Sequence, residues 1–236
     1  MQQLQPQSQS VDVESYSTEI QVVFSQVYLL MTMGLVITAV VAAWVAGNPR
    51  LVNSIFSNWW GPLILFGAQI GLVIGLTAAV YKLAPGVAVA LFIAYSALTG
   101  VTLSVIFWVY TDASIATTFL VTAGTFGAMS LFGFVTKRDL TKMGSLLIML
   151  LLGFVLASLV NLFLRSTAIY WILTFAGIGI FVGLIAWDTQ KIKRMAASGM
   201  ATGKAGSALA VMGALALYLD FINLFLLLLR LFGRRR

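Results

Sequence analysis

Cysteine and histidine are both absent from this chain of 236 residues. Without cysteine there is no disulfide, no thiolate nucleophile and no thiol redox switch, and without either residue there is no Cys/His zinc site. The absence of histidine also removes the usual general base and the usual pH sensor near neutrality. Any proton-linked behaviour must therefore come from carboxyl groups in unusual surroundings.

Charge is scarce as well. Only 9% of the residues are charged, 61% are hydrophobic, and the mean hydropathy is +1.01. These values are typical of polytopic membrane proteins. The 14 Lys and Arg residues outnumber the 7 Asp and Glu residues, but they lie between apolar segments rather than on an aromatic, polar face. Their placement argues against a nucleic-acid partner and indicates topogenic charge and attraction to an anionic lipid bilayer.

Long apolar runs make up most of the chain. Residues 1–19 are polar, rich in Gln and Ser, and lack the basic region of a signal peptide, so we expect a flexible tail followed by a membrane domain at residues 20–236. Runs of about 20 apolar residues can cross a hydrocarbon core. The sequence therefore predicts an all-α fold, a polytopic membrane bundle of seven transmembrane helices. The predicted segments are Phe24–Ala46, Gly61–Tyr81, Gly86–Tyr110, Ser114–Val135, Ser145–Leu164, Ile169–Lys191 and Ala208–Phe232.

The loops between these segments differ in basic charge. With a cytoplasmic N-terminus, the outer loops contain only Arg50 and Arg165, and the inner loops contain many more basic residues. This asymmetry predicts a cytoplasmic N-terminus. The final residues 234–236 are all arginine and disagree, because seven crossings place them outside; a re-entrant last segment is the alternative. The inner basic residues are Lys82, Lys137, Arg138, Lys142, Lys191, Lys193, Arg194 and Lys204.

Glycine recurs at four-residue spacing in two segments. Gly67, Gly71 and Gly75 share one face of the second segment, and Gly179 and Gly183 share one face of the sixth. Small residues at this spacing let membrane helices approach closely. The pattern predicts that both faces pack against neighbouring helices.

Two acidic residues, Asp188 and Asp220, lie inside or against apolar segments. Asp220 stands in a stretch that otherwise has the composition of a lipid-facing helix, where an ionised carboxylate costs about 2.5–3.5 kcal/mol. Each residue has a structural alternative. Asp188 could be an interfacial residue paired with Lys191, and Asp220 could be a buried clamp bonded to Asn223 or to hydroxyls of a neighbouring helix.

A pairing of the two carboxyl groups would have a specific chemistry. Segments six and seven are consecutive and antiparallel, so Asp188 and Asp220 can meet across them. Two carboxylates at low dielectric cannot both ionise cheaply, so the pair would share a proton and latch the helices together. Deprotonated, the pair would repel itself and offer oxygens for weak, transient Ca²⁺ binding. Further candidates for supporting the pair are Asn223, Tyr218 and Lys82, the last as a counter-charge or as a simple positive-inside anchor.

Four stretches are similar to motifs of the Bax inhibitor family, also called the lifeguard or transmembrane Bax inhibitor motif family. Leu217–Phe225 resembles its C-terminal signature, and Ala186–Ile192 resembles its sixth-helix motif with Trp187 in place of the usual tyrosine. Tyr95–Ser104 and Thr136–Leu140 resemble motifs found particularly in its bacterial branch.

The resemblance implies a seven-helix fold in a bacterial inner membrane, with a cytoplasmic N-terminus and a pH-sensitive Ca²⁺ leak. The paired aspartates that form the sensor and gate of the family map onto Asp188 and Asp220. An acidic residue that some members carry in the second helix is missing here, and Gln69 is the nearest polar residue.

These observations predict a pH-sensitive calcium leak channel without a resident cofactor, in which Ca²⁺ is the transported ion. No enzymatic activity is expected, because intramembrane aspartyl proteases carry a Gly-x-Gly-Asp motif, whereas Asp220 follows Tyr218 and Leu219. One alternative is a membrane interaction protein that modulates membrane proteases or stress responses, with purely structural aspartates. Another is a proton-coupled cation exchanger.

Overall fold

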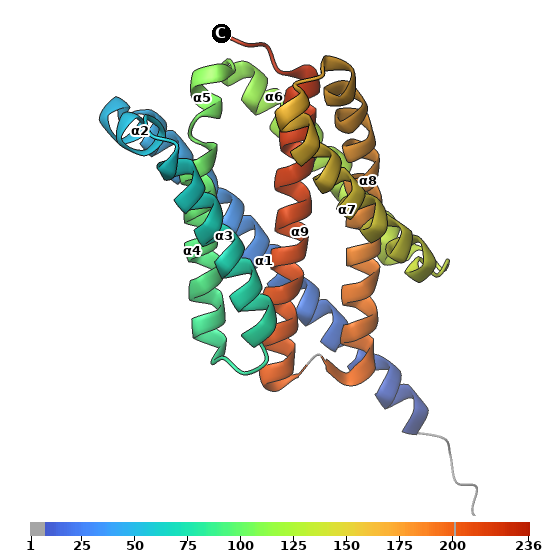
Figure 1. Ribbon diagram of the computed structural model, residues 1–236. Coiled ribbons are helices and arrows are strands. Elements are labelled where there is room, and N and C mark those ends of the chain that lie inside the picture. Colours follow the sequence, from blue (N-terminus) through green and yellow to red (C-terminus); the bar gives the residue numbers. More distant parts are fainter. Residues whose placement is uncertain (1–7, 201) are drawn as a thin grey trace, which may run out of the picture.

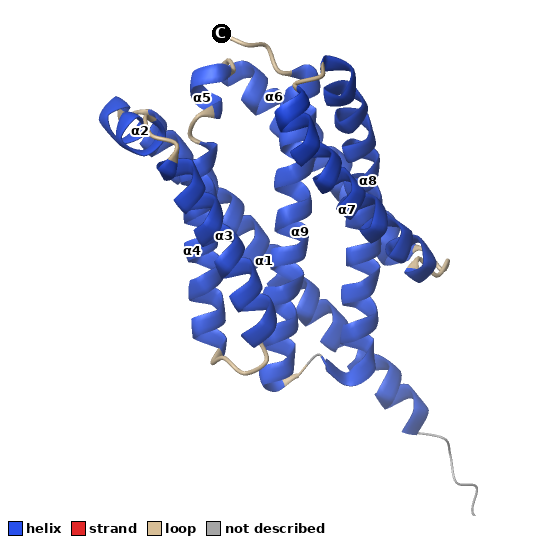
Figure 2. Ribbon diagram, viewed as in Figure 1, coloured by secondary structure: helices blue, strands red, loops and turns tan. Residues whose placement is uncertain are grey.

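The computed structural model describes residues 8–200 and 202–236, and in this part of the chain the regular elements are all helical (Figures 1 and 2). An isolated backbone bridge joins Tyr110 to Arg235. The elements, in chain order, are α1 (Ser8–Ala46), α2 (Pro49–Phe56), α3 (Trp60–Ala79), α4 (Pro85–Leu103), α5 (Ile106–Val109), α6 (Asp112–Val135), α7 (Thr141–Leu164), α8 (Thr167–Met195), the π-helical turn η1 (Ala196–Met200) and α9 (Gly203–Phe232).

Seven helical segments are long and apolar enough to cross a membrane, which confirms the predicted all-α bundle. The third span consists of α4 and α5 together, and the sixth runs from α8 into η1. The short helix α2, which begins at Pro49, was not anticipated. The expected flexible tail stays a prediction: residues 1–7 lie outside the described residues, and the backbone of residues 8–19 forms the first part of α1.

The last helix, α9, is the centre of the bundle. It packs against α1, α4, α6 and α8 and runs unbroken from one end of the bundle to the other (Figure 1). The chain therefore ends at the end of the bundle opposite to the start of α1, as seven crossings require and a re-entrant segment would not. The end of the bundle at which α9 ends is called the C-terminal end, and the end at which α1 starts is called the N-terminal end.

The last segment has the composition of a lipid-facing helix, but most of α9 is enclosed by the other helices and does not face lipid. Its first half is rich in small residues, including Gly206, Ala210, Gly213 and Ala214, all of which are buried. Small side chains let neighbouring helices approach closely. At Gly213, for example, an added methyl group would lie 2.9 Å from Ile192 and 3.0 Å from Val27.

The glycine faces predicted from four-residue spacing are only partly packing faces. An added methyl group at Gly67, Gly71, Gly75 or Gly179 would have no neighbour within 4 Å, and of the five predicted glycines only Gly183 meets a neighbouring helix closely. For the three glycines of the second segment, the reason is that α3 lies at the edge of the bundle and exposes most of its surface. Spacing identifies a smooth face but not the direction in which that face points.

The backbones of two long helices approach closely at Gly133 of α6, where an added methyl group would lie 2.2 Å from the carbonyl oxygen of Ala186 in α8. We expect Gly133→Ala to destabilise the protein by about 1–3 kcal/mol, because the backbones of α6 and α8 would have to separate. Thermal unfolding in detergent measures this effect. The matched control is Gly67→Ala, which meets open space and should be neutral or stabilising because alanine favours helix. Equal losses of stability in the two variants would contradict the packing described here.

Candidate functional site

Asp188 and Asp220 are brought together by the turn between α8 and α9. Gly199 and Gly203 have φ angles of 85° and 59°, which glycine adopts at no steric cost, and they reverse the chain so that the two helices run antiparallel. The helices α8 and α9 then pack along their length. As a result, the carboxyl groups of Asp188 and Asp220 lie close enough to share a hydrogen bond if one of them carries a proton.

This contact has a chemical requirement. An ionised carboxylate is only an acceptor, so a hydrogen bond between two carboxyl groups needs a proton on one of them. Asp220 is only 5% exposed, and its Oδ2 atom receives no hydrogen bond from any other group of the described residues. Two adjacent negative charges in such a site would be strongly unfavourable. The arrangement therefore fits a pair that holds one proton.

The two members of the pair have different surroundings. Asp188 is half-buried and lies nearer to the N-terminal end, where the charge of Lys191 acts on it. The Lys191 ammonium group lies 5.0 Å from the ring centre of Trp187. Asp220 is enclosed by the neighbouring helices. Asp188 is thus the member nearer to solvent, and Asp220 is the member sealed in the bundle.

A chain of hydroxyl groups joins α1, α6 and α8 at the residue that follows Asp188, and sequence reasoning missed it. Tyr28 of α1 is hydrogen-bonded to Ser130 of α6, and Ser130 is hydrogen-bonded across 3.0 Å to Thr189 of α8. Thr189 directly follows Asp188 and is fully buried. Hydroxyl residues within apolar segments were the available signal, but their partners depend on helix packing.

Tyr218 has its hydrogen bond on the side of α9 that faces away from the pair. Its hydroxyl group is hydrogen-bonded across 2.6 Å to Thr38 of α1, and its ring contacts Phe92 and Tyr95 of α4 edge-to-face. Since residues two apart on a helix point about 200° apart, Tyr218 and Asp220 face opposite sides of α9. Tyr218 therefore fastens α9 to α1 and α4.

The hydrogen bonds that the structure shows for Asn223 and Lys82 also lead to groups other than the aspartate pair. The Asn223 side-chain amide donates to the backbone carbonyl of Leu219 at 2.8 Å, and Asn223 lines a cavity toward the C-terminal end. Lys82 is exposed beyond the end of α3, where its backbone carbonyl accepts a hydrogen bond from Lys204 at 3.0 Å. Neither side chain has a hydrogen bond to the aspartate pair among the described contacts.

Two other acidic residues form exposed ion pairs. Asp112 pairs with Arg236 at 2.7 Å and Asp139 pairs with Arg194 at 2.5 Å. Hydrogen bonds from the side chain and backbone of Thr141, together with Arg194, hold the pKa of Asp139 well below its usual range. In the described part of the chain, no group of three or more acidic residues gathers to form a cation site.

The chain is similar to known proteins along most of its length. A family model described as "Inhibitor of apoptosis-promoting Bax1" matches residues 20–236. The inner membrane protein YbhL of Escherichia coli strain K12 is 52% identical over 219 residues, which are 92% of this chain and 93% of YbhL. A protein of Borreliella burgdorferi is 47% identical over 212 residues, 90% of this chain and 91% of that protein. The family resemblance of the sequence motifs is thereby confirmed.

The position of Tyr218 gives a testable separation of structural and functional roles. Tyr218→Phe removes one buried hydrogen bond, and we expect a loss of about 0.5–1.5 kcal/mol of stability. The loss should be at the lower end because Thr38 keeps its bonds to the carbonyl groups of Gly34 and Ser96. Thermal unfolding measures this loss. A pH-dependent property that is altered by Tyr218→Phe but unaffected by Asp220→Asn would contradict the assignment.

Proposed function

Because the chain belongs to the Bax inhibitor family, we propose that it is a pH-sensitive calcium leak channel of the bacterial inner membrane. In this proposal the Asp188–Asp220 pair on α8 and α9 is both the proton sensor and the gate. The supporting observation is the close approach of two carboxyl groups, one of them nearly inaccessible. The proton that this contact needs makes the α8–α9 interface sensitive to pH.

The sign of the response follows from electrostatics. At low pH the pair keeps its proton and the hydrogen bond holds α8 against α9. Removal of the proton leaves two like charges, which at a separation of about 4 Å repel by about 4 kcal/mol at an effective dielectric constant of about 20. The leak should therefore become faster as the pH rises through the loss of the shared proton.

The pair suits passage of a cation better than its storage. Ca²⁺ prefers six to eight oxygen ligands, and two carboxylates supply at most four. Water and backbone carbonyl groups would complete the shell, so binding would be weak and release would be fast. In this proposal, the sealed position of Asp220 belongs to the closed state of the channel.

An enzymatic role has no support in the site beyond the presence of two aspartates. The residues before Asp220 are Tyr218 and Leu219, and both are enclosed or partly enclosed by the bundle. A substrate helix would have to displace neighbouring helices to reach the pair. An ion or a proton requires a much smaller opening.

Calcium flux from proteoliposomes tests the proposal. Wild-type protein should leak Ca²⁺ faster as the pH is raised, and a tenfold change needs only about 1.4 kcal/mol of the repulsion between the aspartates. Asp188→Asn and Asp220→Asn should each weaken the pH dependence, because only one titrating group remains, and the double variant should abolish it. The matched control is Asp112→Asn, an exposed acid-to-amide change that should leave the profile unchanged.

Two results would contradict the channel proposal. One is an identical pH profile in the wild type, the two single variants and the double variant, each shown to be folded by thermal unfolding. The other is a strict counterflow of protons with Ca²⁺, which would identify an exchanger instead of a leak. A pH-independent flux with unfolding temperatures lowered by the asparagine changes would favour purely structural aspartates.

We also propose that the N-terminal end of the bundle is cytoplasmic. The chain has no cysteine, so single introduced cysteines can be labelled without background. Ser57→Cys, exposed between α2 and α3, should react with a membrane-impermeant maleimide on intact spheroplasts. Ser198→Cys, exposed in the turn between α8 and α9, should react only after permeabilisation. The reverse pattern would invert the topology.

A further inference from the structure

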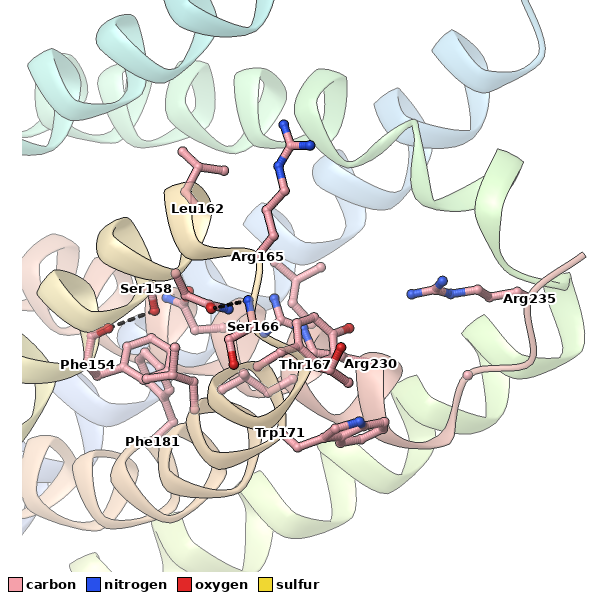
Figure 3. A pocket seen from close by; sticks show the side chains of 17 residues that line it. Phe154, Ser158, Leu162, Arg165, Ser166, Thr167, Trp171, Phe181, Arg230 and Arg235 are labelled. Carbon is pink, nitrogen blue, oxygen red and sulfur yellow. Dashed lines mark hydrogen bonds between the residues drawn. The ribbon is translucent and has the colours of Figure 1, made fainter.

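A basic cavity of about 970 Å³ lies at the C-terminal end of the bundle, between α7, α8, α9 and the last residues of the chain. Three arginines, Arg165, Arg230 and Arg235, belong to its lining (Figure 3). Its lining contains no acidic residue. The volume is in the range of cavities that enclose small-molecule ligands.

Local structure fixes the backbone at two of the arginines and the side chain of the third. Arg165 ends α7 with a φ angle of 52°, and the next backbone N–H, of Ser166, donates to Asn161 Oδ1 at 3.0 Å. The guanidinium group of Arg230 lies 4.6 Å from the ring centre of Tyr170. Arg235 lies in the tail, which the isolated backbone bridge fastens to Tyr110.

The fastening of the tail is specific. The backbone N–H of Thr111 donates to the backbone carbonyl of Arg234 at 3.0 Å. The backbone N–H of Arg236 donates to the backbone carbonyl of Val109 at 3.0 Å. The Arg236 side chain is paired with Asp112. Adjacent arginines of the tail therefore have different surroundings: Arg236 forms an ion pair with Asp112, and Arg235 lines the cavity.

The three cavity arginines form no ion pair with any residue that the structure describes. The ion pairs found in the described part of the chain use Arg194 and Arg236, and none uses the three cavity arginines. Guanidinium groups bind phosphate with paired, charge-assisted hydrogen bonds. Side chains of Asn161 and Ser166, which also line the cavity, can add neutral hydrogen bonds. This chemistry selects a phosphate group over an uncharged polar ligand.

The apolar part of the lining indicates where that phosphate comes from. Leu162 of α7 and Trp171 of α8 line the cavity and are 69% and 40% exposed. Both stand on helices that expose long apolar surfaces, as transmembrane helices do toward lipid. Tryptophan is enriched at the depth of lipid headgroups. A ligand with a phosphate and acyl chains matches both parts of the cavity.

We propose that this cavity binds the phosphate headgroup of an anionic phospholipid, held by Arg165, Arg230 and Arg235, with its acyl chains along the exposed apolar surfaces of α7 and α8. The site is separate from the aspartate pair and does not depend on the calcium proposal. It gives a role to the arginine-rich C-terminal tail, which the sequence alone presented as a conflict with the charge asymmetry of the loops.

Native mass spectrometry of the purified full-length protein tests this site, with dioctanoyl phosphatidylglycerol as the probe. The wild type should bind it in preference to dioctanoyl phosphatidylcholine. Arg230→Gln and Arg165→Gln should each lower the affinity roughly tenfold, the loss expected for a charge-assisted hydrogen bond. Arg50→Gln is the matched control, because Arg50 is an exposed arginine of α2 outside the cavity lining, and it should leave the affinity unchanged.

The other outcomes overturn the proposal. Equal affinities for the two lipids, or equal losses in Arg50→Gln and Arg230→Gln, would show general surface attraction. Inorganic phosphate that binds as tightly as the lipid, with the same dependence on the arginines, would show a site for a soluble anion. Thermal unfolding without lipid identifies any variant that has lost its fold. If either Arg230→Gln or Arg165→Gln is unfolded, the lipid affinity of the other variant decides whether the proposal holds.

Discussion

An acidic side chain in the middle of an apolar helix cannot face lipid cheaply, and this constraint explains the arrangement of the bundle. Exposure of an ionised Asp220 to the hydrocarbon core would cost about 2.5–3.5 kcal/mol on the insertion scale. The fold avoids this cost by enclosing α9 between α1, α4, α6 and α8. Burial then creates a second requirement, because the enclosed carboxyl group needs a partner, and Asp188 supplies it.

The central helix is held differently on its two sides. Toward α1 and α4, Tyr218 and Thr38 form a hydrogen bond within tightly packed aromatic rings, and this bond does not depend on pH near neutrality. Toward α8, the packing includes the aspartate pair, and under the channel proposal this part of the contact responds to protonation. An opening driven by the pair would therefore separate α8 from α9 and leave α9 attached to α1 and α4.

Much of the architecture could be predicted from the sequence. The seven spans follow from the lengths of the apolar runs. Asp188 and Asp220 became candidates because the chain has no histidine or cysteine and few other acids. The direction in which each helix face points could not be read, because it depends on which neighbours enclose that helix. For this reason the glycines of α3 were assigned to a packing face although they face open space, and Tyr218 was grouped with Asp220 although it points away.

The most direct test of the central claim is the infrared spectrum of the carboxyl groups in the reconstituted protein, because a protonated carboxyl group has a C=O stretching band that a carboxylate lacks. At neutral pH the wild type should show this band, perturbed by a hydrogen bond, and its loss on alkaline titration should accompany faster Ca²⁺ leak. Asp188→Asn and Asp220→Asn should each alter or remove the band, whereas Asp112→Asn should not. A wild-type spectrum without the band, or one that both pair variants leave unchanged, would contradict a shared proton between Asp188 and Asp220.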